Sequence, residues 1–177
     1  MLEAEIWGIA ETGDGYMIFV KPLELEYSVP IFIGQIEAQA ILIGFGGISI
    51  PRPLTVDLLQ ILVKEAGLTL LRAEINNLKD NTFFGSLVFK RPSGKELVLD
   101  SRPSDALALA VRCKSPIYIA EKVVEEAGIL AEDIDNSLKT DQKMQKQLLK
   151  AELDDAVAAE NYERAAEIRD MLIFLEK

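Results

Sequence analysis

The sequence predicts an α+β domain with a largely antiparallel or mixed sheet and helices, followed by an α-helical hairpin. In residues 1–135, runs of β-branched and aromatic residues alternate with helix-spaced apolar residues, and Gly and Pro separate them. Residues 136–177 contain no Gly and no Pro and are rich in Ala, Glu, Lys and Leu. We therefore expect two domains, residues 1–135 and residues 143–177, with strands and helices mixed in the first.

The expected strands are short apolar runs bounded by turn residues. Gly13 and Gly15 mark the turn between the first two strands, and Pro92 and Gly94 mark the turn before residue 96. The expected strands are residues 6–11, 16–20, 27–33, 68–75, 82–90, 96–100 and 116–120.

Helices are expected where apolar residues recur at intervals of three and four. The run of residues 54–66, for example, places Leu58, Leu59, Leu62 and Val63 at helical spacing, and Gly67 follows as its stop. The expected helices of the first domain are residues 35–44, 54–66, 103–112 and 122–127.

One arrangement occurs twice in the first domain. A hairpin that ends in an apolar strand is followed by a helix with an acid in its first turn, Glu37 in one copy and Asp105 in the other. This pattern is consistent with an internal ββα duplication. The alternative is two unrelated hairpins of a common shape.

The C-terminal segment has helical spacing in residues 143–159 and 162–176, and Asn161 is placed to cap the second helix. A hairpin of about 35 residues buries too little apolar area to be stable alone, so its apolar stripe should meet another surface. That surface is its own domain, a second copy or another protein. We expect a protein partner or self-association through residues 143–177, and hence a homo-oligomer.

Composition limits the chemistry. The 177 residues carry 19 basic and 29 acidic side chains, a formal net charge of −10, and no histidine. The charge disfavours a simple nucleic-acid-binding module, but it leaves open a local basic site or a metal-bridged phosphate. The single Cys113 forms no internal disulfide, and no organic cofactor is implied. The acidic start and the lack of a long apolar run predict a cytoplasmic protein without membrane contact.

A concentration of polar residues lies between an expected strand end and a helix start. Here Arg102 offers bidentate hydrogen bonds to an anion, and Ser104 offers a hydroxyl group at a helix N-terminus. The alternative is an ordinary helix opening, with Pro103 in the first position and Asp105 in the first turn.

A second Arg-Pro turn precedes the helix expected at residues 54–66. If both helix starts face one cleft, Arg52 and Arg102 form a positive pole, and nearby acids supply oxygens for Mg²⁺ or Mn²⁺. That arrangement suits metal-assisted phosphodiester hydrolysis, which needs no histidine. The alternative is internal Arg–Asp pairing that only organises the fold. The expected catalytic residues are Arg52, Asp57, Arg102, Ser104 and Asp105, and the expected metal ligands are Glu37, Asp100 and Asp105.

Several motifs of the first domain carry a resemblance. Residues 29–38, 51–55, 81–84, 100–106 and 116–119 together resemble the bifunctional nuclease family over roughly residues 1–130. The resemblance implies a compact α+β domain and, as for some members, degradation of DNA and RNA. The positions that match the family's motifs are Glu37, Arg52, Thr55, Asp57, Arg102, Ser104 and Asp105.

One position departs from the family pattern. Where the family commonly reads Pro-Arg-Pro-Leu-Thr-His-Asp, this chain has Val56 in place of the histidine. A mechanism that depends on that imidazole is therefore excluded here.

The C-terminal segment resembles the UVR motif, found at the end of the excision-repair helicase subunit and in its nuclease partner. Leu149, Ala156, residues 160–163 and Leu172 carry the resemblance. It implies an interaction hairpin that pairs with another copy of itself. The sequence thus predicts a nuclease-like protein that hydrolyses DNA or RNA and carries an interaction hairpin. The alternative is a non-enzymatic adaptor that binds a protein or a small anionic ligand.

Overall fold

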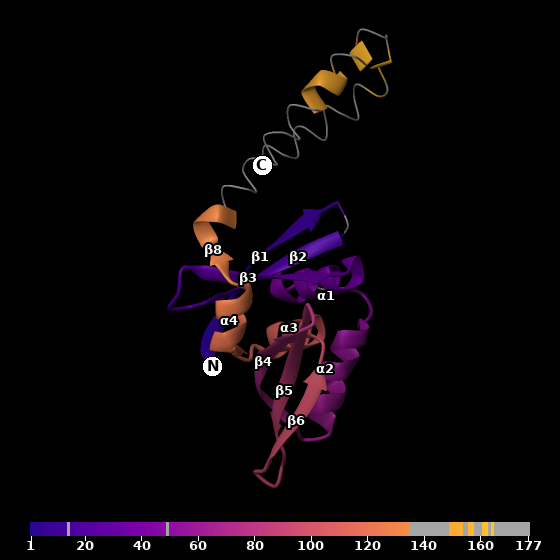
Figure 1. Ribbon diagram of the computed structural model, residues 1–177. Helices are drawn as coiled ribbons and strands as arrows, with labels where there is room; N and C mark the ends of the chain where they lie inside the picture. The colour runs from indigo at the N-terminus through magenta and orange to yellow at the C-terminus, as the bar shows by residue number, and fades with distance from the viewer. Residues whose placement is uncertain are drawn as a thin grey trace. The chain divides into compact units, whose positions relative to one another are not determined.

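The computed structural model describes residues 1–13, 15–48, 50–134, 149–153, 156, 157, 161, 162 and 164 (Figure 1). The chain divides into a first unit, Met1–Leu130, and a second unit, Ala131–Lys177. The two units are described separately.

The first unit is built on one sheet, and it confirms the predicted α+β class. Within the described residues the sheet has eight strands in the order β6-β5-β4-β7-β1-β2-β3-β8. Neighbouring strands pair antiparallel except β4 and β7, which are parallel. The strands are β1 (Leu2–Thr12), β2 (Gly15–Pro22), β3 (Tyr27–Ile33), β4 (Thr69–Lys79), β5 (Thr82–Lys90), β6 (Glu96–Ser101), β7 (Ile117–Ile119) and β8 (Ile129–Leu130).

Helices pack on this sheet around a central α3 (Pro103–Cys113) (Figure 1). The helix α3 contacts β4 and β5 as well as α1 (Gln35–Phe45) and α2 (Thr55–Glu65), and its residues 106–110 are almost completely buried. The short α4 (Glu121–Ala127) contacts β3 and β4. The core lies between the sheet and α3, and Ile41 of α1, Val63 of α2 and Val123 of α4 contribute to it.

The repeated arrangement expected from the sequence is present. Strands β1, β2 and β3 form an antiparallel meander followed by α1, and β4, β5 and β6 form a second meander followed by α3. In both copies one residue separates the strand from the helix, Gly34 before α1 and Arg102 before α3. Glu37 and Asp105 consequently occupy the same position, the third residue of their helices.

Two features differ from expectation. The strand β8 was not expected, because two residues carry no readable alternation; it forms by pairing with Tyr27 and Ser28 of β3. In α2, only Val63 of the four helix-spaced apolar residues is buried, whereas Leu58, Leu59 and Leu62 are 41–65% exposed. The helix was correctly predicted, but its apolar residues mostly face outward.

In the second unit, the described residues on either side of Asn161 are helical. The side-chain Oδ1 of Asn161 accepts a hydrogen bond from the backbone N–H of Arg164 at 3.2 Å, which confirms the predicted cap. Glu152 pairs with Arg164 across the turn at 2.7 Å, and Leu149, Leu153 and Ala156 form an apolar cluster. Most of the expected second helix, residues 165–177, lies outside the described residues. No helix in the described part of the chain has the length and apolar character of a membrane span.

Candidate functional site

The site is centred on Arg102, which precedes the first residue of α3. Strand β6 ends at Ser101 and Pro103 opens the helix, so the intervening Arg102 leaves the sheet with its side chain 65% exposed. Its Nε and Nη2 donate to the two oxygens of Asp105, at 2.8 Å and 3.1 Å. Its Nη1 donates to Oε1 of Glu37 at 2.9 Å. The hydrogen bonds and charge of Asp105, and then those of Glu37, raise the pKa of Arg102, which therefore stays fully charged.

Glu37 reaches Arg102 because of Gly34. A Cβ atom on Gly34 would lie 2.4 Å from Oε2 of Glu37, so the missing side chain leaves the room into which the carboxylate folds. Glu37 is 24% exposed there, more sheltered than Asp105 at 45%. The two acids come from equivalent positions in the two repeated halves and hold one guanidinium between them.

Two cavities meet at this cluster, and Glu37, Arg102 and Ser104 line both. The larger, about 580 Å³, also borders the end of β3, the β4–β5 turn and α4. The smaller, about 360 Å³, lies between α1, the start of α2 and α3, and its walls are mainly apolar. A ligand held by Arg102 can thus extend in two directions.

The charges of the cluster define what it can bind. One guanidinium and two carboxylates give a formal charge of −1. Three of the five N–H groups of Arg102 are used by Glu37 and Asp105, and two remain for an acceptor. Within the described residues, no three carboxylate or thiol groups gather to hold a metal ion by themselves. Carboxylates are nevertheless the donors that a hard divalent cation prefers, and Mg²⁺ is usually held by one or two of them together with substrate phosphates.

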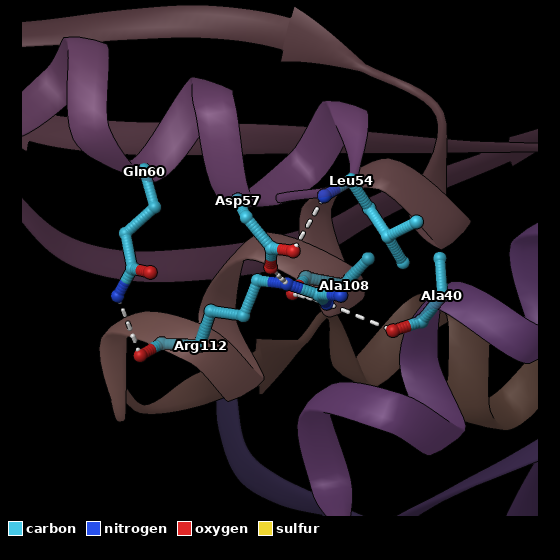
Figure 2. Close-up of polar contacts among 6 residues, drawn as sticks. All are labelled: Ala40, Leu54, Asp57, Gln60, Ala108 and Arg112. Atoms are coloured by element: carbon cyan, nitrogen blue, oxygen red, sulfur yellow. Dashed lines mark hydrogen bonds and ion pairs between the residues drawn. The ribbon is translucent and has the colours of Figure 1, made fainter. Parts of the chain in front are cut away.

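A second polar cluster lies between α1, α2 and α3 (Figure 2). Arg112, at the end of α3, has a side chain only 5% exposed, and its Nε donates to Oδ1 of Asp57. Its Nη1 donates to the backbone oxygens of Ala40 in α1, at 2.8 Å, and of Ala108 in α3, at 3.0 Å. Gln60 donates to the backbone oxygen of Arg112 at 2.8 Å. Arg112 therefore ties α1, α2 and α3 together.

Asp57 has two roles in this cluster. Its Oδ2 accepts a hydrogen bond from the backbone N–H of Leu54 at 2.8 Å, which satisfies a donor at the start of α2. The hydrogen bond from Arg112 is the largest cause that lowers the pKa of Asp57. Among the described residues, none accepts a hydrogen bond from Nη2 of Arg112, which is buried.

The structure brings some of the expected site residues together and separates others. Glu37, Arg102, Ser104 and Asp105 form one cluster, and Thr55 lines the smaller cavity beside them. Asp57 instead pairs with Arg112. This is an internal Arg–Asp pair, as in the alternative given for the sequence, but the arginine is Arg112 and not Arg52 or Arg102. The other two expected residues lie apart from the cluster: Arg52 is exposed before α2 and lines neither cavity, and Asp100 is exposed on β6 opposite Ser86.

Sequence reasoning missed Arg112 and Gly34. An arginine in the last turn of an apolar helix usually lies in solvent beside the carbonyl groups, so its type and position gave no sign of burial. Gly34 lies within the motif of residues 29–38, but the sequence alone assigns it no role. Only the position of Glu37, three residues later as in a capping arrangement, could have suggested one.

Comparisons with known proteins identify related families for both parts of the chain. The bifunctional nuclease domain matches residues 18–132, and the UvrB/uvrC motif matches residues 143–177, which confirms both resemblances. An uncharacterized protein of Mycobacterium tuberculosis is 41% identical over 105 residues, 59% of this chain and 62% of the relative. Bifunctional nuclease 2 of Arabidopsis thaliana is 25% identical over 166 residues, 81% of this chain and 50% of the relative.

A third relative, bifunctional nuclease 1 of Oryza sativa subsp. japonica, is 24% identical over 103 residues, 57% of this chain and 31% of the relative. The matched segments thus span less than two thirds of each of these relatives. The domain match, in contrast, covers more than half of this chain and includes every member of the Arg102 cluster. The chain therefore belongs to the bifunctional nuclease domain family.

Proposed function

We propose that the first unit binds a phosphodiester of DNA or RNA at Arg102 and hydrolyses it. The observation that carries this proposal is an exposed guanidinium with two free N–H groups at the meeting point of two cavities. Membership of the bifunctional nuclease family supports it, and so do the names of the plant relatives.

Each residue of the cluster has a role in this proposal. Arg102 holds the non-bridging phosphate oxygens and opposes the charge that develops on them. The chain has no histidine, and in this proposal a carboxylate accepts the proton of the attacking water. Glu37 and Asp105 are the carboxylates in place, and Ser104 adds a hydroxyl group beside them. Arg52 lines neither cavity, so Arg102 is the cation of the proposed site, while Asp57 fixes the start of α2 through the backbone N–H of Leu54 and pairs with Arg112.

The charge of the cluster supports a role for a divalent cation. A phosphodiester carries one negative charge and is repelled by a site of formal charge −1. A Mg²⁺ or Mn²⁺ ion held by Glu37 and Asp105, with oxygens of the substrate, would change the formal charge of the site to +1. When bound, such an ion supplies a Lewis acid that polarises the phosphate. Asp100 is the third expected ligand, and its exposed place on β6 makes it the first of the three whose removal should be tolerated.

A cleavage assay with the purified 177-residue chain tests the proposal. The substrates are fluorescent single- and double-stranded DNA and RNA, and each reaction contains Mg²⁺, Mn²⁺ or excess chelator. The test variant is Arg102→Ala. The control is Arg91→Ala, which removes an exposed arginine in the turn at the opposite end of β6. We expect cleavage that requires metal, survives in the control variant and falls at least about 100-fold in Arg102→Ala.

Two outcomes would reject the assignment. Equal cleavage by Arg102→Ala and the wild-type protein would mean that the site lies elsewhere or that the activity belongs to a contaminant. No cleavage by any folded preparation would favour the second function, a non-enzymatic adaptor. One observation supports that alternative: α2 directs three leucines outward, and an apolar helix face of this kind is typical of an interaction surface.

A further inference from the structure

The smaller cavity differs in character from the charged cluster at its mouth. It measures about 360 Å³, near the lower end of the range for small-molecule sites. Its walls are contributed by three helices. The apolar lining residues are Ile36, Ala40, Ile43, Leu54, Val56 and Ala108.

The polar lining residues are the charged cluster of Glu37, Arg102, Ser104 and Asp105, together with the exposed Gln39 and Thr55, which offer an amide group and a hydroxyl group. Arg102 is the only cation among the residues that line the cavity. Because Glu37 and Asp105 repel any further negative charge, a ligand that fills the cavity has one anionic group, placed at Arg102, joined to an uncharged body that forms hydrogen bonds at its edge. A nucleotide has this composition, because its base is apolar on its faces and polar along its edge.

We propose that this cavity is a base-binding subsite, which receives the base of the nucleotide whose phosphate lies on Arg102. The proposal rests on the proposed function and specifies its substrate: recognition includes a base as well as the phosphodiester. The larger cavity, bordered by Asn81, Thr82 and Glu126, is left for the continuing sugar–phosphate chain. Of the two cavities, only the smaller has predominantly apolar walls, and this difference assigns the base to it.

Val56 and Ala40 are the residues through which the subsite can be changed. Both are half-buried and line the cavity from different helices, α2 and α1. Val56→Phe and Ala40→Leu add volume to the cavity from two sides. Val98→Phe makes the same substitution at an exposed position of β6 that lines neither cavity, and it serves as the matched control.

The test is binding of two probes to the full-length protein, measured by titration calorimetry in the presence of Mg²⁺. Adenosine 5′-monophosphate carries phosphate, sugar and base, and ribose 5-phosphate lacks only the base. We expect the wild-type protein and Val98→Phe to bind the nucleotide about tenfold more tightly than ribose 5-phosphate. Val56→Phe and Ala40→Leu should lose that preference while their affinity for ribose 5-phosphate is unchanged, and Arg102→Ala should weaken both probes.

The result separates this inference from the proposed function. Equal affinity of the wild-type protein for the two probes, both dependent on Arg102, would overturn the base subsite and leave the phosphate site intact. A preference that persists in both filled variants would also overturn it, because the base would then bind elsewhere. Binding that does not depend on Arg102 would contradict the phosphate site itself and the subsite with it. Ala40→Leu provides the comparison if Val56→Phe does not fold.

Discussion

Arg102 precedes α3 and Arg112 lies ten positions later in its last turn, and their surroundings give them different tasks. Arg102 is 65% exposed, pairs with two acids and keeps free donors, whereas Arg112 is 5% exposed and donates to α1, to α2 and to its own helix. An exposed ion pair adds little to stability because water competes with it, while a buried charge depends on its partners. We therefore assign binding to Arg102 and structural support to Arg112.

The first prediction concerns Asp57. Replacement by Asn removes the carboxylate with which the buried guanidinium of Arg112 pairs, and we expect a loss of about 3 kcal/mol in the free energy of unfolding. Urea unfolding followed by circular dichroism measures the loss. Asp105→Asn is the control, since it removes one carboxylate from an exposed pair and should cost less than about 1 kcal/mol. Equal losses in the two variants would contradict the structural role of Arg112.

The second prediction is the pH dependence of the same pair. The folded-state pKa of Asp57 lies below its ordinary value of 3.8, chiefly because Arg112 donates to the carboxylate. A lowered pKa stabilises the folded state at pH values above the unfolded pKa, and the contribution disappears as pH falls through the folded pKa. The difference in unfolding free energy between wild type and Asp57→Asn should thus be constant from pH 7 to about pH 5 and shrink below about pH 4. A difference that grows on acidification would refute this assignment.

The third prediction concerns Gly34. Its backbone angles, φ −75° and ψ 165°, are open to alanine, but a Cβ atom would occupy the space of the Glu37 carboxylate. Gly34→Ala should therefore fold, displace Glu37 from Arg102 and lower the cleavage rate about 100-fold, as misplacement of a reacting group by about 1 Å can do. Cleavage assays and melting temperatures measure the two effects. Gly8→Ala, at a position with open space around the new atom, should leave cleavage unchanged.

These residues show what the sequence could and could not reveal about the site. Arg102 and Asp105 are three apart at a helix start, so their contact was within reach of local reasoning. Glu37 is 65 positions from Arg102, and their contact depends on how two meanders pack. The pairing of Asp57 with Arg112 instead of Arg52 depends likewise on the crossing of α2 and α3.

At the scale of elements, local signals determined most of the fold. Pro103 opens α3, Gly67 follows α2 with a φ of +67°, and Gly94 takes a φ of +84° in the β5–β6 turn, as the sequence predicted. Periodicity showed that residues 55–65 are helical, but it did not show which side of the helix the sheet would cover. The order of the strands and the parallel pair β4–β7 also depend on contacts remote in sequence.

The fourth prediction tests the outward face of α2. Leu62 is 65% exposed and Val63 is 9% exposed, although they are neighbours in the same helix. Leu62→Ala should change the free energy of unfolding by less than about 0.5 kcal/mol, and Val63→Ala should lower it by about 2 kcal/mol. Urea unfolding at low and high protein concentration gives both values. A large loss in Leu62→Ala that appears only at high concentration would show that this face is covered by another chain.

At the scale of the whole molecule, the two units present apolar surface of different kinds. In the second unit, the described residues Leu149, Leu153 and Ala156 form an apolar cluster, and Glu152 and Arg164 form an ion pair across the turn. A helical hairpin of about 35 residues supplies little of the stability that a separate domain needs. Together with the matched UvrB/uvrC motif, this is the physical reason to expect that the hairpin associates with another surface.

The fifth prediction is that this surface is a second copy of the chain. Leu153→Asp places a charge in the apolar cluster and should convert an oligomer, measured by light scattering, into single chains. Lys150→Asp places the same charge at an exposed position of the same helical segment and should leave the mass unchanged. Cleavage per chain should be equal in the two variants, because the Arg102 cluster lies wholly within the first unit. An oligomeric mass that stays constant in Leu153→Asp would exclude self-association through the hairpin and leave a different protein as its partner. If Leu153→Asp instead lost both the oligomer and the cleavage activity, the active site would be completed only in the oligomer.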